Sequence, residues 1–166
     1  MPIQRKPDGW YWGGKGPFKT RAKAQQVATA AYASGYKKES IMNQETVGEF
    51  IGNLLHSATI THFMHLQVTG EGSNAKHMAL AAYYDGIVDL ADSLAEAIQG
   101  CEKTIITGYP TMFANVSGEP VNYLESLKDY VAEKRGSISD ESNIQNEIDG
   151  IVTLIDSTIY KLTFLR

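Results

Sequence analysis

The amino-acid sequence predicts an all-α fold, a four-helix bundle preceded by a small N-terminal extension. Apolar residues recur at steps of three and four over most of residues 43–166, which is typical of amphipathic helices. Glycine and proline fall between these segments rather than within them, and the 43% apolar content suffices for a packed core. Composition changes near residue 40, so we assign residues 1–40 to an N-terminal arm and residues 41–166 to the bundle.

The N-terminal arm is basic, aromatic and rich in glycine. Both tryptophans and four glycines lie within positions 9–16, which favours turns and short strands. Thr20 is a suitable N-cap for a helix over residues 21–34, ended by Gly35. Residues 1–38 hold eight basic residues and one acidic residue, a net charge of +7, whereas residues 39–166 hold seven basic and eighteen acidic residues, a net charge of −11. Such an arm can contact DNA, a capsid or another partner, or dock on its own acidic body.

The first two helices of the bundle are expected on either side of a glycine-containing turn. Residues 44–68 form the first, with one inward face made of Val47, Ile51, Leu54, Ala58, Thr61, His62 and His65. Residues 69–72 break the pattern. Ser73 or Asn74 then caps a second helix that reaches Gln99 and is ended by Gly100.

The second pair of helices follows a longer connection over residues 101–118, with room for a short helix around residues 111–115. The third helix spans residues 119–135, with Pro120 in its first turn and Gly136 as its stop. The fourth begins at Ser139 or Asp140 and runs to the C-terminus. Two helix pairs joined by one longer crossover match the ferritin-like variant of the four-helix bundle.

The histidines cluster, which indicates a functional site. All four lie within 22 positions, and His62 and His65 are three residues apart on the inward face of the first helix. On the second helix, one stripe is predicted to face inward and to carry carboxylates: His77, Ala81, Asp85, Val88, Asp92 and Glu96. Buried carboxylates are costly unless they are paired or bind metal, and imidazole with carboxylate suits iron, zinc or manganese. The alternative to a metal site is that these side chains are core residues whose polar atoms are hydrogen-bonded within the protein.

The spacing within the second helix makes any shared metal site intermolecular. Asp92 and Glu96 are about one turn apart and can bind one ion together. His77 lies fifteen residues before Asp92, roughly 22 Å along a straight helix. Two antiparallel copies of the helix across a twofold axis would place His77 of one chain beside Asp92 and Glu96 of the other. His65 could reach His77 across the turn that contains Gly70.

These residues together resemble the signature of the Dps family of ferritin-like proteins. His65 is followed by Gly70 after five residues and by His77 after twelve, and the D-x-x-A-E segment from Asp92 to Glu96 begins fifteen residues later. The resemblance is strong over residues 65–96 and extends loosely over residues 43–166.

The resemblance implies a ferroxidase. Dps-like proteins form dodecameric shells that oxidise Fe(II) with hydrogen peroxide or dioxygen at dimer interfaces and store the ferric mineral. By position, His65 and His77 would be ligands from one subunit, and Asp92 and Glu96 from its partner. If a second iron binds, Glu96 would be the bridging carboxylate. Iron is the expected metal, with zinc as a surrogate.

Several positions depart from the Dps pattern. Leu66 stands where the family usually has Trp, and Ala81 where some members have an acidic residue. Fewer carboxylates put a second iron position in doubt, and His62 is an additional candidate ligand. His56 is expected at the surface, opposite His65.

A second function remains open, because these departures favour a non-catalytic assembly protein that uses the basic arm to bind a capsid, a partner or DNA. The run from Gly9 to Tyr36 resembles short modules of bacteriophage proteins, which would make the chain phage-encoded.

The single cysteine, Cys101, and the lack of an apolar leader predict a cytoplasmic protein. No run of eighteen apolar residues exists, so no membrane span is expected.

Overall fold

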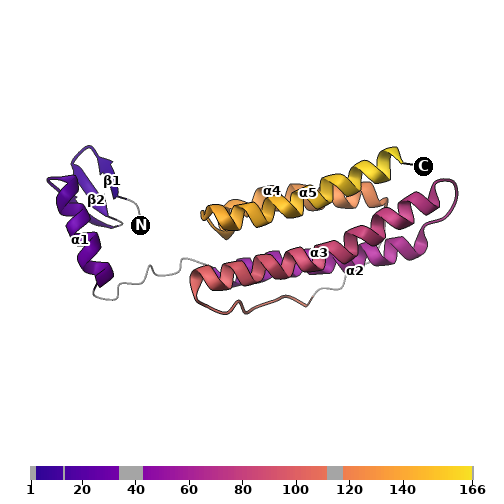
Figure 1. Ribbon diagram of the computed structural model, residues 1–166, viewed down its shortest axis with the longest axis horizontal. Coiled ribbons are helices and arrows are strands. Elements are labelled where there is room, and N and C mark those ends of the chain that lie inside the picture. The colour runs from indigo at the N-terminus through magenta and orange to yellow at the C-terminus, as the bar shows by residue number, and fades with distance from the viewer. Residues whose placement is uncertain (1–2, 13, 34–42, 112–117, 166) are drawn as a thin grey trace. The chain divides into compact units, whose positions relative to one another are not determined.

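The computed structural model describes residues 3–12, 14–33, 43–111 and 118–165 (Figure 1). The chain divides into two compact units, Met1–Ile41 and Met42–Arg166. The described residues are mostly helical, as the sequence predicts, but the first unit also contains a small β-sheet. Among the described helices, none combines the length and the apolarity that crossing a bilayer requires.

The first unit is a three-stranded antiparallel sheet with one helix packed on it. Strands β1 (Ile3–Lys6), β2 (Gly9–Trp12) and β3 (Lys15–Phe18) pair in that order, so the expected short strands are confirmed. Helix α1 (Arg21–Ala33) packs mainly against β2 and β3. Trp12, Ala24 and Ala28 are buried in this unit. The sheet departs from the expected all-α fold because residues 9–18 are rich in aromatic residues, which favour strands, and in glycines, which disfavour helix.

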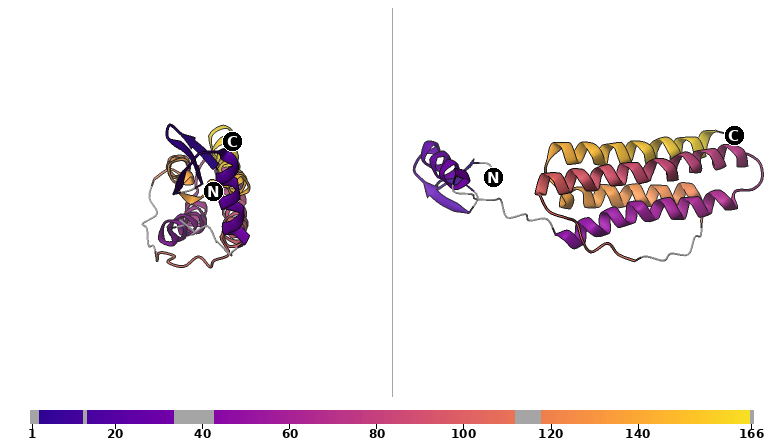
Figure 2. Two further views of the ribbon diagram at one scale, coloured as in Figure 1. Left: turned by 90° about the vertical axis from the view of Figure 1, so that its left-hand side faces the viewer. Right: turned by 60° about the horizontal axis from the view of Figure 1, so that its bottom comes forward.

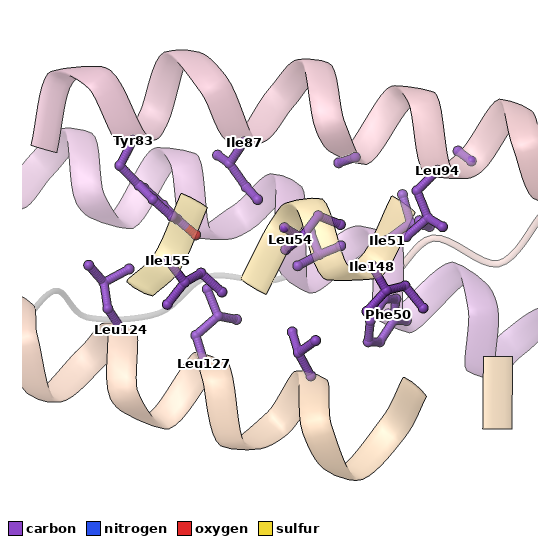
Figure 3. Packing of buried hydrophobic residues seen from close by; sticks show 14 of the residues in the cluster. Phe50, Ile51, Leu54, Tyr83, Ile87, Leu94, Leu124, Leu127, Ile148 and Ile155 are labelled. Carbon is purple, nitrogen blue, oxygen red and sulfur yellow. The ribbon is translucent and has the colours of Figure 1, made fainter. Parts of the chain in front are cut away.

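The second unit consists of four long helices, α2 (Gln44–Gln67), α3 (Ser73–Glu102), α4 (Pro120–Ile138) and α5 (Ser142–Phe164). They lie side by side along one direction (Figures 1 and 2). Helix α3 packs against both α2 and α5, and α4 packs mainly against α5. The apolar core runs between all four helices (Figure 3), and its largest fully buried members are Tyr83, Phe50, Ile51, Leu54, Leu80, Ile87, Leu94, Ile98, Leu124, Ile144 and Ile148.

Several helix boundaries differ from those predicted, two of them at a glycine. Helix α3 continues through Gly100 to Glu102 and ends at Lys103, which adopts the left-handed conformation with φ 53°. Helix α4 continues through Gly136 to Ile138. A glycine inside a helix costs only about 1 kcal/mol, and Ile138 offsets this cost because its side chain is buried in the core. Helix α5 begins at Ser142 rather than at Ser139 or Asp140.

After the turn at Lys103, the connection from α3 towards α4 is an extended loop over residues 105–111 that packs closely on α2. A Cβ atom added at Gly48 would lie 2.8 Å from the carbonyl oxygen of Thr107, and one added at Gly52 would lie 2.9 Å from Cδ of Pro110. Ile106, in the middle of this segment, is buried. The two glycines, one helical turn apart, therefore form the surface on which the connection lies. Most of the short helix expected at residues 111–115 lies outside the described residues, as does the expected helix stop at Gly35.

Candidate metal centre

The turn between α2 and α3 brings two histidines into contact. Gly70 and Gly72 both have positive φ, 84° and 72°, a conformation that glycine adopts without strain. The chain therefore reverses within a few residues after α2. As a result, the rings of His65 and His77 stack with their centroids 3.5 Å apart. The prediction that His65 reaches His77 across this turn is confirmed.

Each histidine of this pair is held by a hydrogen bond to the backbone of the other. Nδ1 of His65 lies 2.9 Å from the carbonyl oxygen of His77, and Nδ1 of His77 lies 3.3 Å from the carbonyl oxygen of His65. A carbonyl oxygen can only accept, so Nδ1 carries the proton in both rings. The lone pair of each ring is then on Nε2. Histidines that bind metals usually have this arrangement, with one nitrogen donating to a carbonyl and the other facing the ion.

His62 and Tyr84 extend the histidine pair along the surface of α2 and α3. The rings of His62 and Tyr84 stack at 4.3 Å, and Tyr84 meets His65 edge-on at 5.3 Å. His65 is buried, whereas His62 is exposed, so the expectation that His62 lies on the inward face is wrong. Tyr84 was not predicted, although it lies two helical turns after His77 and therefore on nearly the same side of α3.

A buried pair of hydroxyl groups, from Ser57 and Tyr83, links α2 to α3. The hydroxyls of Ser57 and Tyr83 lie 2.8 Å apart inside the core, and Ser57 Oγ also donates to the carbonyl oxygen of Leu54. Burial raises the pKa of Tyr83, so its hydroxyl stays neutral and keeps this hydrogen bond. The pair links the two helices that carry His65 and His77.

The carboxylates predicted as ligands lie on the outer surface of α3, and the expectation of an inward stripe is wrong. His77, Asp85, Val88, Asp89, Asp92 and Glu96 are all exposed, and we call these six residues the outer stripe of α3. The core side of the helix is formed instead by Leu80, Tyr83, Ile87, Ala91, Leu94 and Ile98. The apolar residues occupy the inward side because burying them stabilises the fold, whereas burying unpaired carboxylates would cost several kcal/mol each.

The structure therefore brings together some of the predicted site residues within one chain and separates others. His65 and His77 are in contact, and His62 is next to them. Asp92 and Glu96 lie farther along α3, on the same outer stripe as His77. Within the described residues, no three His, Cys, Asp or Glu side chains of one chain gather closely enough to hold a metal ion.

Two acidic residues lie closer to the histidines than the predicted ligands do. Asp85 and Asp89 border a shallow surface hollow next to the histidine cluster, lined by Ala58, Thr59, His62, Tyr84, Asp85, Val88 and Asp89. His56 lies elsewhere, in an apolar hollow between α2 and α4 that also includes Tyr123 and Tyr130. It is half-buried rather than fully exposed, and it does not contribute to the histidine pair.

Comparison with known proteins gives one match. Residues 65–162, more than half of the chain, match a family described as a family of unknown function (DUF5856), and the chain belongs to this family. The matched range begins at His65 and includes His77, Asp92 and Glu96, whereas the additional candidate ligand His62 lies outside it. No curated protein and no solved structure gives a significant match.

Proposed function

We propose that this chain oxidises Fe(II) at metal sites shared between two copies of itself, in a ferritin-like assembly. The observation that carries the proposal is the His65–His77 pair. Both Nδ1 atoms lie within hydrogen-bonding distance of backbone carbonyl oxygens, which leaves both Nε2 atoms as electron-pair donors for a metal ion. A stacked histidine pair held in this way, with His65 buried and His77 exposed, is preorganised to bind a cation.

The remaining ligands come from a second copy in this proposal. Asp92 and Glu96 are exposed and one helical turn apart, so their carboxylates can share one ion. His77 lies fifteen residues earlier on the same continuous helix, about 22 Å away. Two α3 helices packed antiparallel by their outer stripes would place the histidine pair of one chain beside the carboxylates of the other. The twofold axis then generates two equivalent sites per dimer.

The donor set suits the oxidation of iron. Two imidazole nitrogens with two carboxylates form a mixed N/O set that binds Fe(II), and zinc can serve as a surrogate. When two Fe(II) ions each give one electron to hydrogen peroxide, its O–O bond breaks and two protons complete two water molecules. In this proposal Glu96 would bridge the two ions, and His62 would be an additional ligand for the second. The Dps resemblance extends the proposal to a dodecameric shell that stores the ferric product.

The proposal predicts a ferric absorbance rise when hydrogen peroxide is added to protein loaded anaerobically with Fe(II). The double substitution His65→Ala, His77→Ala should lower the rate at least about tenfold, because it removes half of the ligands and their orienting hydrogen bonds. His56→Ala is the matched control and should leave the rate unchanged, since His56 lies in a different hollow. An unaltered rate in the double variant would show that the iron is oxidised elsewhere.

A non-catalytic assembly function is the second candidate, and one observation favours it. Phe63, Leu66 and Met78, on the helix ends that carry the histidine pair, are 48%, 67% and 61% exposed, and a group of exposed apolar side chains is typical of a binding surface. Both functions require that copies of the chain associate through the surface formed by Phe63, Leu66, Met78 and the histidine pair. Metal analysis after reconstitution with Fe(II) or Zn(II) separates them, because bound metal in proportion to dimers supports the ferroxidase and its lack supports the assembly protein.

A further inference from the structure

One face of the sheet in the N-terminal unit is left uncovered by α1. Trp12 is buried in the unit, and α1 packs against β2, so Trp12 lies on the covered face. Side chains alternate along a strand, and the neighbouring Tyr11 therefore points to the opposite face. Gln4 is paired with Tyr11 in the adjacent strand, and Lys6 follows two residues later on the same face. Gln4 and Lys6 are exposed.

Tyr11 forms an aromatic platform on this open face. Its ring lies directly against the backbone at Gly16, where an added Cβ would be only 2.6 Å from Cδ1 of Tyr11. Its hydroxyl donates a 2.6 Å hydrogen bond to the carboxylate of Asp8. The ring is therefore fixed in orientation before any ligand binds. The ammonium group of Lys6 lies over the ring, 4.5 Å from its centroid.

The N-terminal unit that carries Tyr11 is strongly basic. Lys6 lies at Tyr11 itself, whereas Arg5 and Lys15 lie over Trp10 and Trp12. Between residues 3 and 33 the sequence has six basic residues, Arg5, Lys6, Lys15, Lys19, Arg21 and Lys23, against Asp8 alone, a net charge of +5. All six side chains are exposed. A positive field of this density in so short a segment attracts a polyanion.

We propose that the open sheet face binds single-stranded nucleic acid, with a base stacked on Tyr11, a backbone phosphate bound by Lys6, and the strand attracted by the net positive charge of the unit. Proteins that bind single strands combine a positive surface with fixed aromatic rings on which bases stack. Lys6 moves from the ring to a phosphate as the base takes its place. Duplexes are poor ligands for this surface because their base faces are covered by neighbouring pairs.

Fluorescence anisotropy of the full chain with labelled 20-nucleotide DNA and RNA single strands, and with the matching duplex, tests the proposal. Both single strands should bind more tightly than the duplex. Tyr11→Ala should weaken single-strand binding about 5- to 100-fold, the range that loss of one stacked base produces. Tyr11→Phe should retain binding, because it keeps the ring and removes only the hydroxyl. Lys6→Gln should reduce the slope of log affinity against log salt by about 0.7, since it removes one phosphate contact.

Controls separate stacking from general charge attraction and from unfolding. Tyr109→Ala removes an exposed tyrosine of the other unit and should not change binding. Both tryptophans lie in β2, so tryptophan emission reports on the folding of this unit alone. Wild-type affinity in folded Tyr11→Ala, equal affinity for the duplex, or displacement of the oligonucleotide by equimolar poly-glutamate would overturn the proposal. These outcomes are independent of whether iron is oxidised.

Discussion

Two inactive variants are expected to restore each other when they are mixed. One carries His65→Ala and His77→Ala, and the other carries Asp92→Ala and Glu96→Ala. Each alone lacks part of every site. In a hybrid dimer, one site loses all four ligands, whereas the other combines intact histidines from one chain with intact carboxylates from its partner. Random pairing makes half of the dimers hybrid, with one of two sites intact, so about one quarter of the wild-type Fe(II) oxidation should return.

The rate is measured after refolding an equimolar mixture, so that chains exchange between dimers. Each variant refolded alone is the control and should stay inactive. A mixture that remains as inactive as its components would contradict the shared site, because ligands within one chain cannot complement between chains. The same measurement with Zn(II) content in place of the oxidation rate separates metal binding from oxidation.

Gly48→Ala is expected to destabilise the protein by about 1–3 kcal/mol, although alanine favours helix formation by ~1 kcal/mol over glycine. The added Cβ would lie 2.8 Å from the carbonyl oxygen of Thr107 and 3.0 Å from that of Gly108. Backbone atoms cannot move aside locally, so the whole extended segment shifts away from α2. This shift exposes Ile106, whose burial is worth about 1.5–3 kcal/mol, and breaks the hydrogen bond from its amide to Gln99.

Urea denaturation followed by circular dichroism measures this free energy of unfolding. Gly136→Ala is the matched control, because Gly136 is also helical but an added Cβ would meet no atom within 4 Å. This control should stabilise the protein by about 0.5–1 kcal/mol. If both substitutions stabilise it equally, the extended segment does not need the close approach at Gly48.

The helices could be predicted from the sequence because each has a strong apolar period. Ile144, Ile148, Ile151 and Ile155 are all buried on α5, as their spacing indicates. Helix ends follow less directly from the sequence, because a glycine inside a helix costs only about 1 kcal/mol and does not by itself end the helix. Gly136 does not end α4 because the buried Ile138 follows it, and that burial depends on contacts between distant segments.

The outer stripe of α3 was predicted to face the core, because helical spacing shows that a set of residues shares one side of a helix but not whether that side faces the core. His77, Asp92 and Glu96 recur with helical spacing, but so do Leu80, Ile87 and Leu94 on the other side. Burying apolar side chains lowers the free energy of the folded protein, whereas burying unpaired carboxylates raises it. The apolar stripe therefore forms the core side of α3. On α2 the same error is confined to His62, because the predicted inward face there already contains the buried Ile51 and Leu54.

The contact between His65 and His77 could be predicted from the sequence, but the hydrogen bonds that orient the two rings could not. The distance along the chain and the glycines of the turn indicate that the two meet. The reciprocal hydrogen bonds depend on how the two helix ends are positioned in space. The stacking of Tyr84 on His62 likewise depends on the side-by-side packing of α2 and α3.

The outer stripe of α3 has a consequence for how two chains would recognise each other. In the proposed dimer, the midpoint between His77 and the Asp92–Glu96 pair falls near Asp85, so each Asp85 would face its own counterpart. Two like charges at such a self-contact repel, and metal bound at the two shared sites would offset this cost, because each site takes ligands from both chains. The free energy of association would then rise with the supply of free metal, because the ion binds the pair and not the separated chains. Self-association would thus act as a sensor of iron.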